Sequence, residues 1–250
     1  MPVFQLSEKS IFPPAYLARF DGLLCVGGDL SPARLLLAYK NGIFPWFSNN
    51  EPILWWCPDP RLVLYPENFK ISKSLKKKIR KNYFKITMDK AFQDIIYACA
   101  QTRVKKNQDT WITNNMIKAY IKLYKKGYAH SVEIWEHKEL IGGLYGISLG
   151  GCFFGESMFS KVSDASKIAI AALNTHIKKL KFDFIDCQIP TNHMLSLGAV
   201  KVPRNIFLDQ IKLSLKKKNH KGIWEFSGFE DKIINDNCGV DYKFNSNIRQ

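Results

Sequence analysis

Three polar side chains in two apolar stretches of this sequence could take part in proton transfer and hydrogen bonding. Asp186 and Gln188 lie in FDFIDCQIP, residues 182–190, and Glu156 lies in FFGESMFS, residues 153–160. In an extended strand, Asp186 and Gln188 share one face because side chains alternate. A carboxylate in an apolar strand is costly unless it is paired or protonated. A hydrogen-bonded core role is the alternative for each residue alone, but three such residues in two strands favour a polar site.

The elements that must position these side chains follow from periodicity and end signals. Ser31 is an expected N-cap, Pro32 the first helical residue and Gly42 the residue that closes that helix. The proline-interrupted aromatic stretch over 44–60 predicts loops and short strands. Further helices are expected near 72–81, 89–100, 113–127, 163–180, 192–197 and 203–217, and strands over 130–136, 140–148, 152–159, 182–188 and 199–202.

This order of elements predicts an α+β fold. Antiparallel strands followed by a helix and a further strand resemble the acyltransferase-like (GNAT) architecture, with a mixed and mostly antiparallel sheet. We expect a small N-terminal domain over 1–62, a GNAT-like domain over 63–215 and a polar, poorly ordered tail over 216–250. The analogy concerns the fold and does not give a function.

Composition narrows the possible partners. The chain has 37 Lys and Arg against 22 Asp and Glu, a net charge of +15, which favours nucleic acid or another anionic surface. A lysine-rich genome is the alternative explanation. The sequence contains no apolar run near the roughly 20 residues that span a bilayer, and its start lacks a signal-peptide pattern. We therefore expect a cytoplasmic protein without a membrane partner. Cys and His show no zinc spacing, so no metal is expected.

Several common chemistries do not fit the motifs. GESMF is not the G-x-S-x-G of serine hydrolases, and GGLYGISLGG is neither a dinucleotide nor a P-loop pattern. The [R/Q]-x-x-G-x-[G/A] stretch that holds CoA pyrophosphate in many GNAT enzymes is also absent from the sequence. A basic chain with an acyltransferase-like order and no CoA motif is compatible with an acyl donor carried on nucleic acid.

Seven motifs in order carry a family resemblance from about Phe12 to Leu213. They are GGDLSPARLLLAYKNGIFPWF, PILWWCPDPR, TWIT, GGLYG, FFGESMFS, ASK and DCQ…SLGA. Together they resemble the bacterial leucyl/phenylalanyl-tRNA–protein transferases. The resemblance implies an aminoacyltransferase that moves Leu or Phe from leucyl- or phenylalanyl-tRNA to the N-terminal Arg or Lys of a protein, which marks that protein for N-degron degradation. It implies no cofactor, and we expect a monomer.

The resemblance also implies roles for individual residues. Asp186 and Gln188 would form a catalytic relay, in which we expect Gln188 to orient the amine and Asp186 to polarise Gln188 or to take a proton through water. Glu156 would bind the cationic acceptor residue. An apolar pocket would hold the aminoacyl side chain and admit some Met, because rejecting one methylene is difficult. Its positions are Leu144, Phe153, Met158, Ala169, Leu173 and Ile185.

Three points stay open at this stage. Leu173 stands where the family is expected to have phenylalanine, which leaves the Leu/Phe preference undecided. Ile185 lies on the strand face opposite Asp186, so both can line one site only if the strand twists or splays. A plain core role is the alternative for some of the pocket residues.

The tRNA would contact aromatic and basic residues. Trp111 and Trp46 are candidates to stack on the terminal adenine, with packing in the core of the small domain as the alternative. A basic helix would meet the phosphates, with a solvated face as the alternative; its candidate residues are Lys73, Lys76, Lys77 and Arg80. Two other functions compete with the aminoacyltransferase: another GNAT-like acyltransferase, either CoA-dependent or forming cell-wall peptide bridges, and a non-catalytic RNA-binding protein.

Overall fold

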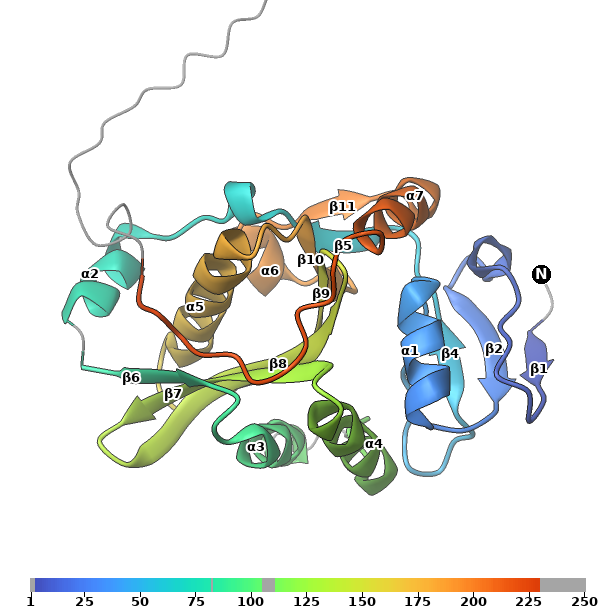
Figure 1. Cartoon of the computed structure of the whole chain (residues 1–250), viewed down its shortest axis with the longest axis horizontal. Coiled ribbons are helices and arrows are strands. Elements are labelled where there is room, and N and C mark those ends of the chain that lie inside the picture. Colours follow the sequence, from blue (N-terminus) through green and yellow to red (C-terminus); the bar gives the residue numbers. More distant parts are fainter. Residues whose placement is uncertain (1–2, 82, 105–110, 230–250) are drawn as a thin grey trace, which may run out of the picture.

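A computed structural model of the chain describes residues 3–81, 83–104 and 111–229. The strands within these ranges form two sheets, which lie along the long axis of the molecule (Figure 1). The smaller sheet has the order β1-β2-β4-β3, with β1 and β2 parallel and the other pairs antiparallel. Its strands are β1 (Phe4–Leu6), β2 (Leu23–Gly27), β3 (Phe44–Pro45) and β4 (Leu54–Trp56).

Helix α1 (Pro32–Lys40) connects β2 to β3 and has the ends that the sequence predicts. The Ser31 hydroxyl accepts a hydrogen bond from the Arg34 backbone N–H at 3.4 Å, and Pro32 occupies the first turn. Gly42 follows with φ +71°, and a Cβ at this position would lie 2.9 Å from the Leu208 and Phe207 side chains. A glycine at this position therefore satisfies both the left-handed backbone and the close packing.

The larger sheet has the order β11-β5-β10-β9-β8-β7-β6. Among its described pairs, β9 and β10 run parallel and the others antiparallel, so the expected α+β class with a mixed, mostly antiparallel sheet is confirmed. Its strands are β5 (Arg61–Leu64), β6 (Lys85–Met88), β7 (Ala129–Glu136), β8 (Glu139–Leu149), β9 (Cys152–Ser160), β10 (Phe184–Gln188) and β11 (Val200–Val202).

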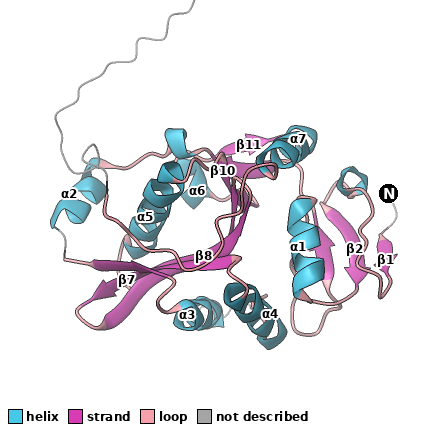
Figure 2. Ribbon diagram, viewed as in Figure 1, coloured by secondary structure: helices cyan, strands magenta, loops and turns pink. Residues whose placement is uncertain are grey.

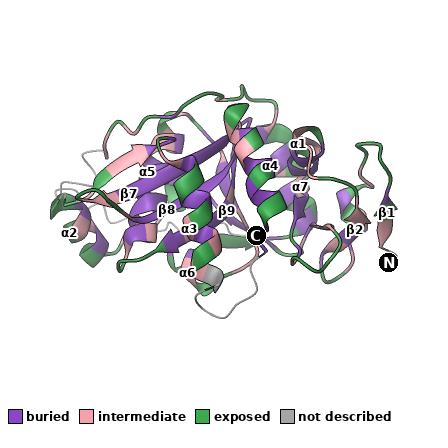
Figure 3. Cartoon of the chain, turned by 90° about the horizontal axis from the view of Figure 1, so that it is seen from below, coloured by how far each residue is buried: buried purple, intermediate pink, exposed green. Residues whose placement is uncertain are grey.

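Helices cover both faces of the larger sheet (Figure 2). They are α2 (Lys73–Lys81), α3 (Phe92–Val104), α4 (Asn114–Lys125), α5 (Ala165–Lys179), α6 (Asn192–Ser196) and α7 (Arg204–Ser214), with short 3-10 turns at Ala15–Leu17 and Pro66–Asn68. Alternation along the strands sends Phe154 and Phe184 toward α3, α4 and α7, and Phe153 and Ile185 toward α5. Figure 3 shows the strands buried between helices whose outer faces are exposed.

The two sheets are joined by one continuous apolar core. Leu24 and Trp55 of the smaller sheet belong to the same buried cluster as Phe154 and Phe184 of the larger sheet. The expected domain boundary after residue 62 falls within β5, because that strand begins at Arg61 and pairs inside the larger sheet. The linking residues thus enter the second sheet slightly earlier than the sequence suggests.

The expected polar tail over 216–250 is wrong in its first part. Residues 216–229 lie against the folded chain, and the indole of Trp224 is buried with 5% exposure. Apolar residues at wide spacing in this polar segment made no periodic pattern, so the sequence did not predict their packing. The remainder of the tail, residues 230–250, lies outside the described residues.

Candidate active site

A cavity of about 450 Å³ lies where the larger sheet meets the small N-terminal unit. Strands β8, β9 and β10 and helix α5 provide its apolar wall. The facing wall comes from Phe44–Trp46 of the small unit and from Trp111. Among the described lining residues only Glu156 is acidic, and the Gln188 amide lies beside it. The cavity is therefore apolar over most of its surface, with polar groups at the Glu156–Gln188 pair and at Ser157, Thr191 and His193.

Five of the six predicted pocket residues line this cavity: Leu144, Phe153, Met158, Leu173 and Ile185. Ala169 does not line it and is instead fully buried in the core beneath α5. Ile170, which lies on the other side of Leu173 around the helix, takes its place. Helical spacing alone did not show which side of Leu173 faces the cavity.

The two strands that carry the polar residues separate at the cavity. Parallel pairing of β9 with β10 ends where Asp186 lies opposite Phe154, and β9 then continues to Ser160. Beyond that point Gln188 pairs with Leu62 of β5. This separation parts the main chains of the two strands, and the hydrogen bond between the Glu156 and Gln188 side chains bridges them. It does not bring Ile185 and Asp186 to one site, because Asp186 does not line the cavity.

The expectation that Asp186 and Gln188 share one strand face is wrong. The register against β5 shifts between these residues, and Gln188 has φ +61°. This β-bulge adds one residue, so the alternation breaks and Gln188 turns into the cavity together with Ile185. Asp186 is fully buried and is not a lining residue.

Asp186 instead forms a buried ion pair with Arg61 of β5. Arg61 donates from Nε to Asp186 Oδ1 at 2.8 Å and from Nη2 to Oδ2 at 2.7 Å, and both side chains have no exposure. The guanidinium also lies over the Phe44 and Phe207 rings, at 4.8 and 4.6 Å from their centroids. Burial disfavours the charged guanidinium of Arg61. The attraction of the Asp186 carboxylate outweighs this effect and raises the pKa of Arg61 above its usual value.

The same carboxylate holds the bulge. Asp186 Oδ1 accepts the backbone N–H of Gln188 at 2.9 Å, so Arg61 and the Gln188 main chain share one acceptor. Sequence reasoning missed Arg61. A buried carboxylate needs a cationic partner. The apolar surroundings of Asp186 in the sequence could therefore have predicted a partner arginine in another apolar segment.

Glu156 is the centre of a second buried network. Its Oε1 accepts from the Tyr39 hydroxyl at 2.8 Å and from Gln188 Nε2 at 2.9 Å, and its Oε2 accepts from the Tyr120 hydroxyl at 2.6 Å. The two tyrosine hydroxyls also bond to each other. Tyr39 lies on α1 and Tyr120 on α4, so the network ties the small unit to the larger sheet. Sequence reasoning missed both tyrosines, which read as ordinary residues of apolar helix faces.

The environment of Glu156 changes its protonation. Burial raises the pKa of Glu156 to about 7, the Asp186 charge adds to the rise, and the hydrogen bonds from Tyr120, Tyr39 and Gln188 oppose it. The folded protein therefore binds a proton at this site more tightly than the unfolded chain, whose value is 4.5. The contribution of Glu156 to the free energy of unfolding therefore falls as the pH rises from 4.5 to about 7, and it is constant at higher pH.

Glu156→Gln is expected to remove this pH dependence. The stability of the variant relative to the natural protein should increase between pH 4.5 and about 7 and level off at higher pH. Urea unfolding of both proteins at a series of pH values measures the difference. A difference that stays constant across this interval contradicts the raised pKa, whereas loss of hydrogen bonds alone shifts all values equally.

The two predicted stacking residues lie in the wall of the cavity. Trp46 is 41% exposed, and Trp111 is nearly buried. Trp55 is fully buried in the core, where its Nε1 donates to the Gly27 carbonyl at 2.9 Å. Trp56 donates from Nε1 to the Trp46 carbonyl at 2.7 Å and so supports the neighbouring rim.

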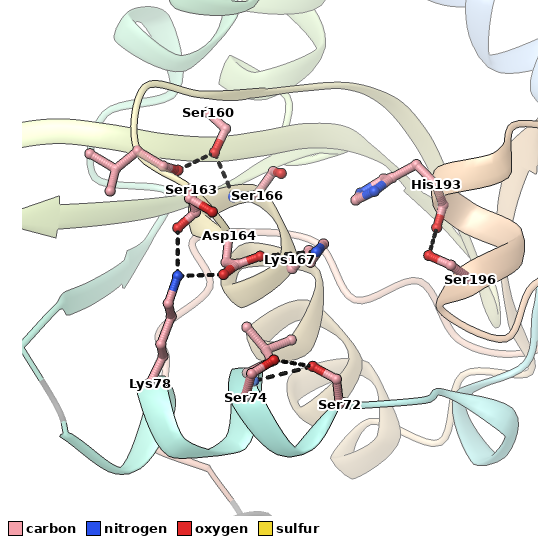
Figure 4. Close-up of polar contacts among 12 residues, drawn as sticks. Ser72, Ser74, Lys78, Ser160, Ser163, Asp164, Ser166, Lys167, His193 and Ser196 are labelled. Carbon is pink, nitrogen blue, oxygen red and sulfur yellow. Dashed lines mark hydrogen bonds and ion pairs between the residues drawn. The ribbon is translucent and has the colours of Figure 1, made fainter.

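The basic helix α2 forms where the sequence predicts it, away from the small unit (Figure 1). Ser72 Oγ accepts from the Leu75 backbone N–H at 3.2 Å, and Leu75 and Ile79 are buried. Figure 4 shows Lys78 Nζ bonded to the Asp164 carboxylate and to the Ser163 carbonyl, near the start of α5. The four predicted phosphate ligands, which do not line the cavity, are Lys73, Lys76, Lys77 and Arg80.

No group of three or more metal-binding side chains occurs within residues 3–81, 83–104 and 111–229. Over the same ranges, the helices are too short or too polar to cross a bilayer.

The splayed strands, the apolar cavity and the carboxylate–amide pair place the protein in the acyltransferase-like class of transferases. Sequence comparison identifies the particular family. The leucyl/phenylalanyl-tRNA protein transferase model matches residues 63–212, and the model of that family's N-terminal domain matches residues 28–59. The chain belongs to the leucyl/phenylalanyl-tRNA protein transferase family, and it is an aminoacyltransferase.

Individual relatives agree over nearly the whole chain. A leucyl/phenylalanyl-tRNA–protein transferase of Desulforapulum autotrophicum is 59% identical over 92% of this chain and 100% of its own length. Proteins of the same name from Syntrophobacter fumaroxidans and Desulfatibacillum aliphaticivorans are 52% and 54% identical, each over 90% of this chain and 96% of its own length.

Among solved structures, an aminoglycoside acetyltransferase from an uncultured soil sample, in complex with sisomicin, is a distant match. It is 15% identical over 46% of this chain and 85% of that chain, with a TM-score of 0.36, which is too low to support an argument.

Proposed function

We propose that this protein transfers a leucyl or phenylalanyl group, and methionyl weakly, from aminoacyl-tRNA to proteins that begin with Arg or Lys. The observation that carries the proposal is the cavity, which is apolar over most of its surface and has one carboxylate and one amide at its polar end. The names of the relatives support both substrates. The new N-terminus would mark the acceptor protein for degradation.

The aminoacyl side chain is proposed to occupy the apolar part of the cavity. Burying a Leu or Phe side chain gives about 1.5–3 kcal/mol. Met158 is unbranched and adapts its shape to donors of different form. A pocket of this kind discriminates weakly between side chains that differ by one methylene, which is why Met is included. Leu173, where a phenylalanine is expected in the family, leaves more room than an aromatic ring at that position.

Gln188 is proposed to orient the attacking amine. Because its Nε2 donates to Glu156 at 2.9 Å, its Oε1 is the atom that can accept a hydrogen bond from the amine. Asp186 has its oxygens turned to Arg61 and to the Gln188 main chain, so we assign it a positioning role instead of proton transfer. This replaces the relay expected from the resemblance.

Glu156 is proposed to attract the acceptor and to take its proton. The acceptor carries a cationic side chain and an α-amine, and a carboxylate attracts both. With a pKa of about 7, Glu156 is close to the roughly 8 of an α-amine, a suitable match for proton transfer. The amine nitrogen bonds to the ester carbonyl carbon, Glu156 receives the amine proton, and the ester C–O bond breaks. The released tRNA ribose oxygen takes a proton in turn.

The tRNA is proposed to bind by stacking and by charge. Trp111 and Trp46 line the cavity, where either ring can stack on the terminal adenine for about 1–3 kcal/mol per base. Helix α2 is proposed to contact the phosphates through Lys73, Lys76, Lys77 and Arg80. We further propose that the protein needs no cofactor, because an aminoacyl ester is already activated, and that it works as a monomer in the cytoplasm.

Removing charge from α2 is expected to weaken tRNA binding in a salt-dependent way. The double substitution Lys76→Ala and Lys77→Ala should reduce the slope of log K against log[salt] by about 1–2, because each phosphate contact releases counterions. Fluorescence titration with aminoacylated tRNA at several salt concentrations measures the slope. Lys125→Ala with Lys126→Ala removes equal charge at the end of α4, and an equal effect of that control would contradict a specific role for α2.

The proposed function is tested by a direct transfer assay. The protein is mixed with labelled Phe-tRNA and with matched peptides that begin with Arg, Lys or Ser, and label is followed into peptide. Transfer to the Arg and Lys peptides is expected, and the Ser peptide should remain unlabelled. Labelling of the Ser peptide alone would exclude the acceptor assignment, and transfer from phenylalanyl-CoA in place of the tRNA would favour a CoA-dependent acyltransferase.

A further inference from the structure

The described end of the chain packs against the sheet near the donor pocket. We call residues 217–229 the C-terminal strap. It starts after α7 and runs toward the side of the molecule that carries α2 (Figure 1). The Gly222 N–H donates to the Gly127 carbonyl at 3.3 Å, and Lys179 Nζ donates to Ser227 Oγ at 3.0 Å. The strap is thus attached to the end of α4 and to the end of α5.

Trp224 is the buried anchor of the strap. Its indole stacks on the His130 ring with centroids 3.7 Å apart and an interplanar angle of 9°, and the His176 ring lies 4.8 Å away. Its backbone N–H donates to Asp89 Oδ2 at 2.8 Å, and its Nε1 donates to the His220 carbonyl at 3.0 Å. These contacts hold the indole in one orientation.

Asp89 fixes His130, on which the indole stacks, as well as the main chain of Trp224. Its Oδ2 bonds to His130 Nδ1 at 2.8 Å, and its Oδ1 accepts the Ser131 N–H at 2.8 Å. Asp89 lies between β6 and α3 and His130 lies on β7, so residues far apart in the sequence converge on Trp224. These hydrogen bonds through Asp89 restrict the movement of the His130 ring and of the Trp224 main chain.

Phe153 connects this anchor to the donor pocket. Its side chain lines the cavity, and the Trp224 ring lies 6.0 Å from its ring centroid at 39°. A Cβ at Gly146 would lie 2.5 Å from the Phe153 ring, so the ring rests directly on the backbone of β8. The Phe153 ring therefore lies against the backbone of β8 and beside the Trp224 ring, and it also lines the cavity.

We infer that Trp224 is a specificity-determining residue, which sets the depth of the aminoacyl pocket by backing Phe153. This inference rests on the proposed function, because it takes the cavity as the donor site. Trp224 acts through Phe153 and so is a positioning residue. Without the indole, the Phe153 ring can recede from the cavity, and a deeper pocket favours Phe over Leu.

Trp224→Ala is expected to raise the ratio of kcat/KM for Phe-tRNA to that for Leu-tRNA by about 10-fold, the lower end of the effect of one methylene in an apolar pocket. Trp224→Phe keeps a ring behind Phe153 and should retain most of the natural ratio. Phe226→Ala is the matched control, because it removes a ring of the same strap that contacts Phe229. The control should leave the ratio unchanged.

The outcomes separate this inference from the proposed function. Circular dichroism establishes which variants fold. If Trp224→Ala does not fold, Trp224→Leu keeps an apolar side chain without the ring and is measured instead. Loss of thermal stability with an unchanged ratio overturns the inference and leaves a structural role. If the natural protein transfers neither donor, the proposed function fails and the inference fails with it.

Discussion

Replacing Arg61 with alanine is expected to lower the free energy of unfolding by about 3–5 kcal/mol, which is the usual cost of removing one member of a buried ion pair and leaving the other unpaired. Asp186 is then buried without its cationic partner, and two hydrogen bonds of 2.7 and 2.8 Å are lost. The rings of Phe44 and Phe207 also lose the cation between them. Urea unfolding followed by circular dichroism measures the loss.

A double substitution separates charge from positioning. Arg61→Met with Asp186→Leu removes both charges and fills the space with apolar groups, so most of the stability should return. Turnover should stay low, because the Gln188 N–H loses its acceptor and the bulge loses its restraint. A loss below about 1 kcal/mol for Arg61→Ala, typical of exposed pairs, would contradict the buried pair. Full activity of the double variant would contradict the positioning role of Asp186.

Gln188→Ala is expected to lower kcat by about 10²-fold, the effect of misplacing a reacting group by about 1 Å. The KM for aminoacyl-tRNA should change little, because we place the donor side chain and the adenine against other residues of the cavity. Single-turnover transfer of labelled Phe to an Arg peptide measures the chemical step. An unchanged kcat with a raised KM would assign Gln188 to binding alone.

Gln188 and Glu156 should act as one unit. Glu156→Ala removes the oxygen that accepts from Gln188 Nε2, so the amide loses its fixed orientation. The double variant should therefore lose little more than the more damaging single substitution. Ile189→Val is the control for changes in neighbouring lining residues, and it should retain kcat. Additive losses would show that the two residues act independently.

Local signals predicted the helices and the strands β7 to β11 of this fold, but they did not predict β1, β2, β5 or β6. The Ser31 cap, the proline at position 32 and Gly42 define α1 correctly, and apolar alternation defines β9 from Cys152. Five pocket residues and both site residues at the polar end lie where the motifs imply, because the motifs lie on strands and helices whose ends are marked. The prediction for the C-terminal segment was wrong because that segment has no such signals: Trp224 is an isolated aromatic residue in a polar stretch.

The bulge at Gln188 has no local signal. Neither Cys187 nor Gln188 is a glycine, and an extended strand is the natural interpretation of FDFIDCQ. The left-handed backbone at Gln188 is held by pairing with β5 and by the Asp186 carboxylate two residues earlier, which accepts its N–H and is itself fixed by the distant Arg61. Strain at one residue is tolerated when the surrounding structure restrains it. The sequence of a single strand does not show which neighbouring strands and side chains provide that restraint.

The amino-acid sequence was enough to establish the family and the α+β class, and it predicted most of the apolar residues and two of the polar residues that line the cavity, because these depend on motifs and short-range periodicity. Tertiary structure alone decided what each polar residue faces. Arg61 neutralises Asp186 from 125 positions away, Tyr39 and Tyr120 orient Glu156 from two helices, and Trp224 backs Phe153 from the end of the described chain. Burying a charge or a polar group requires partners, and the fold supplies them from distant parts of the chain.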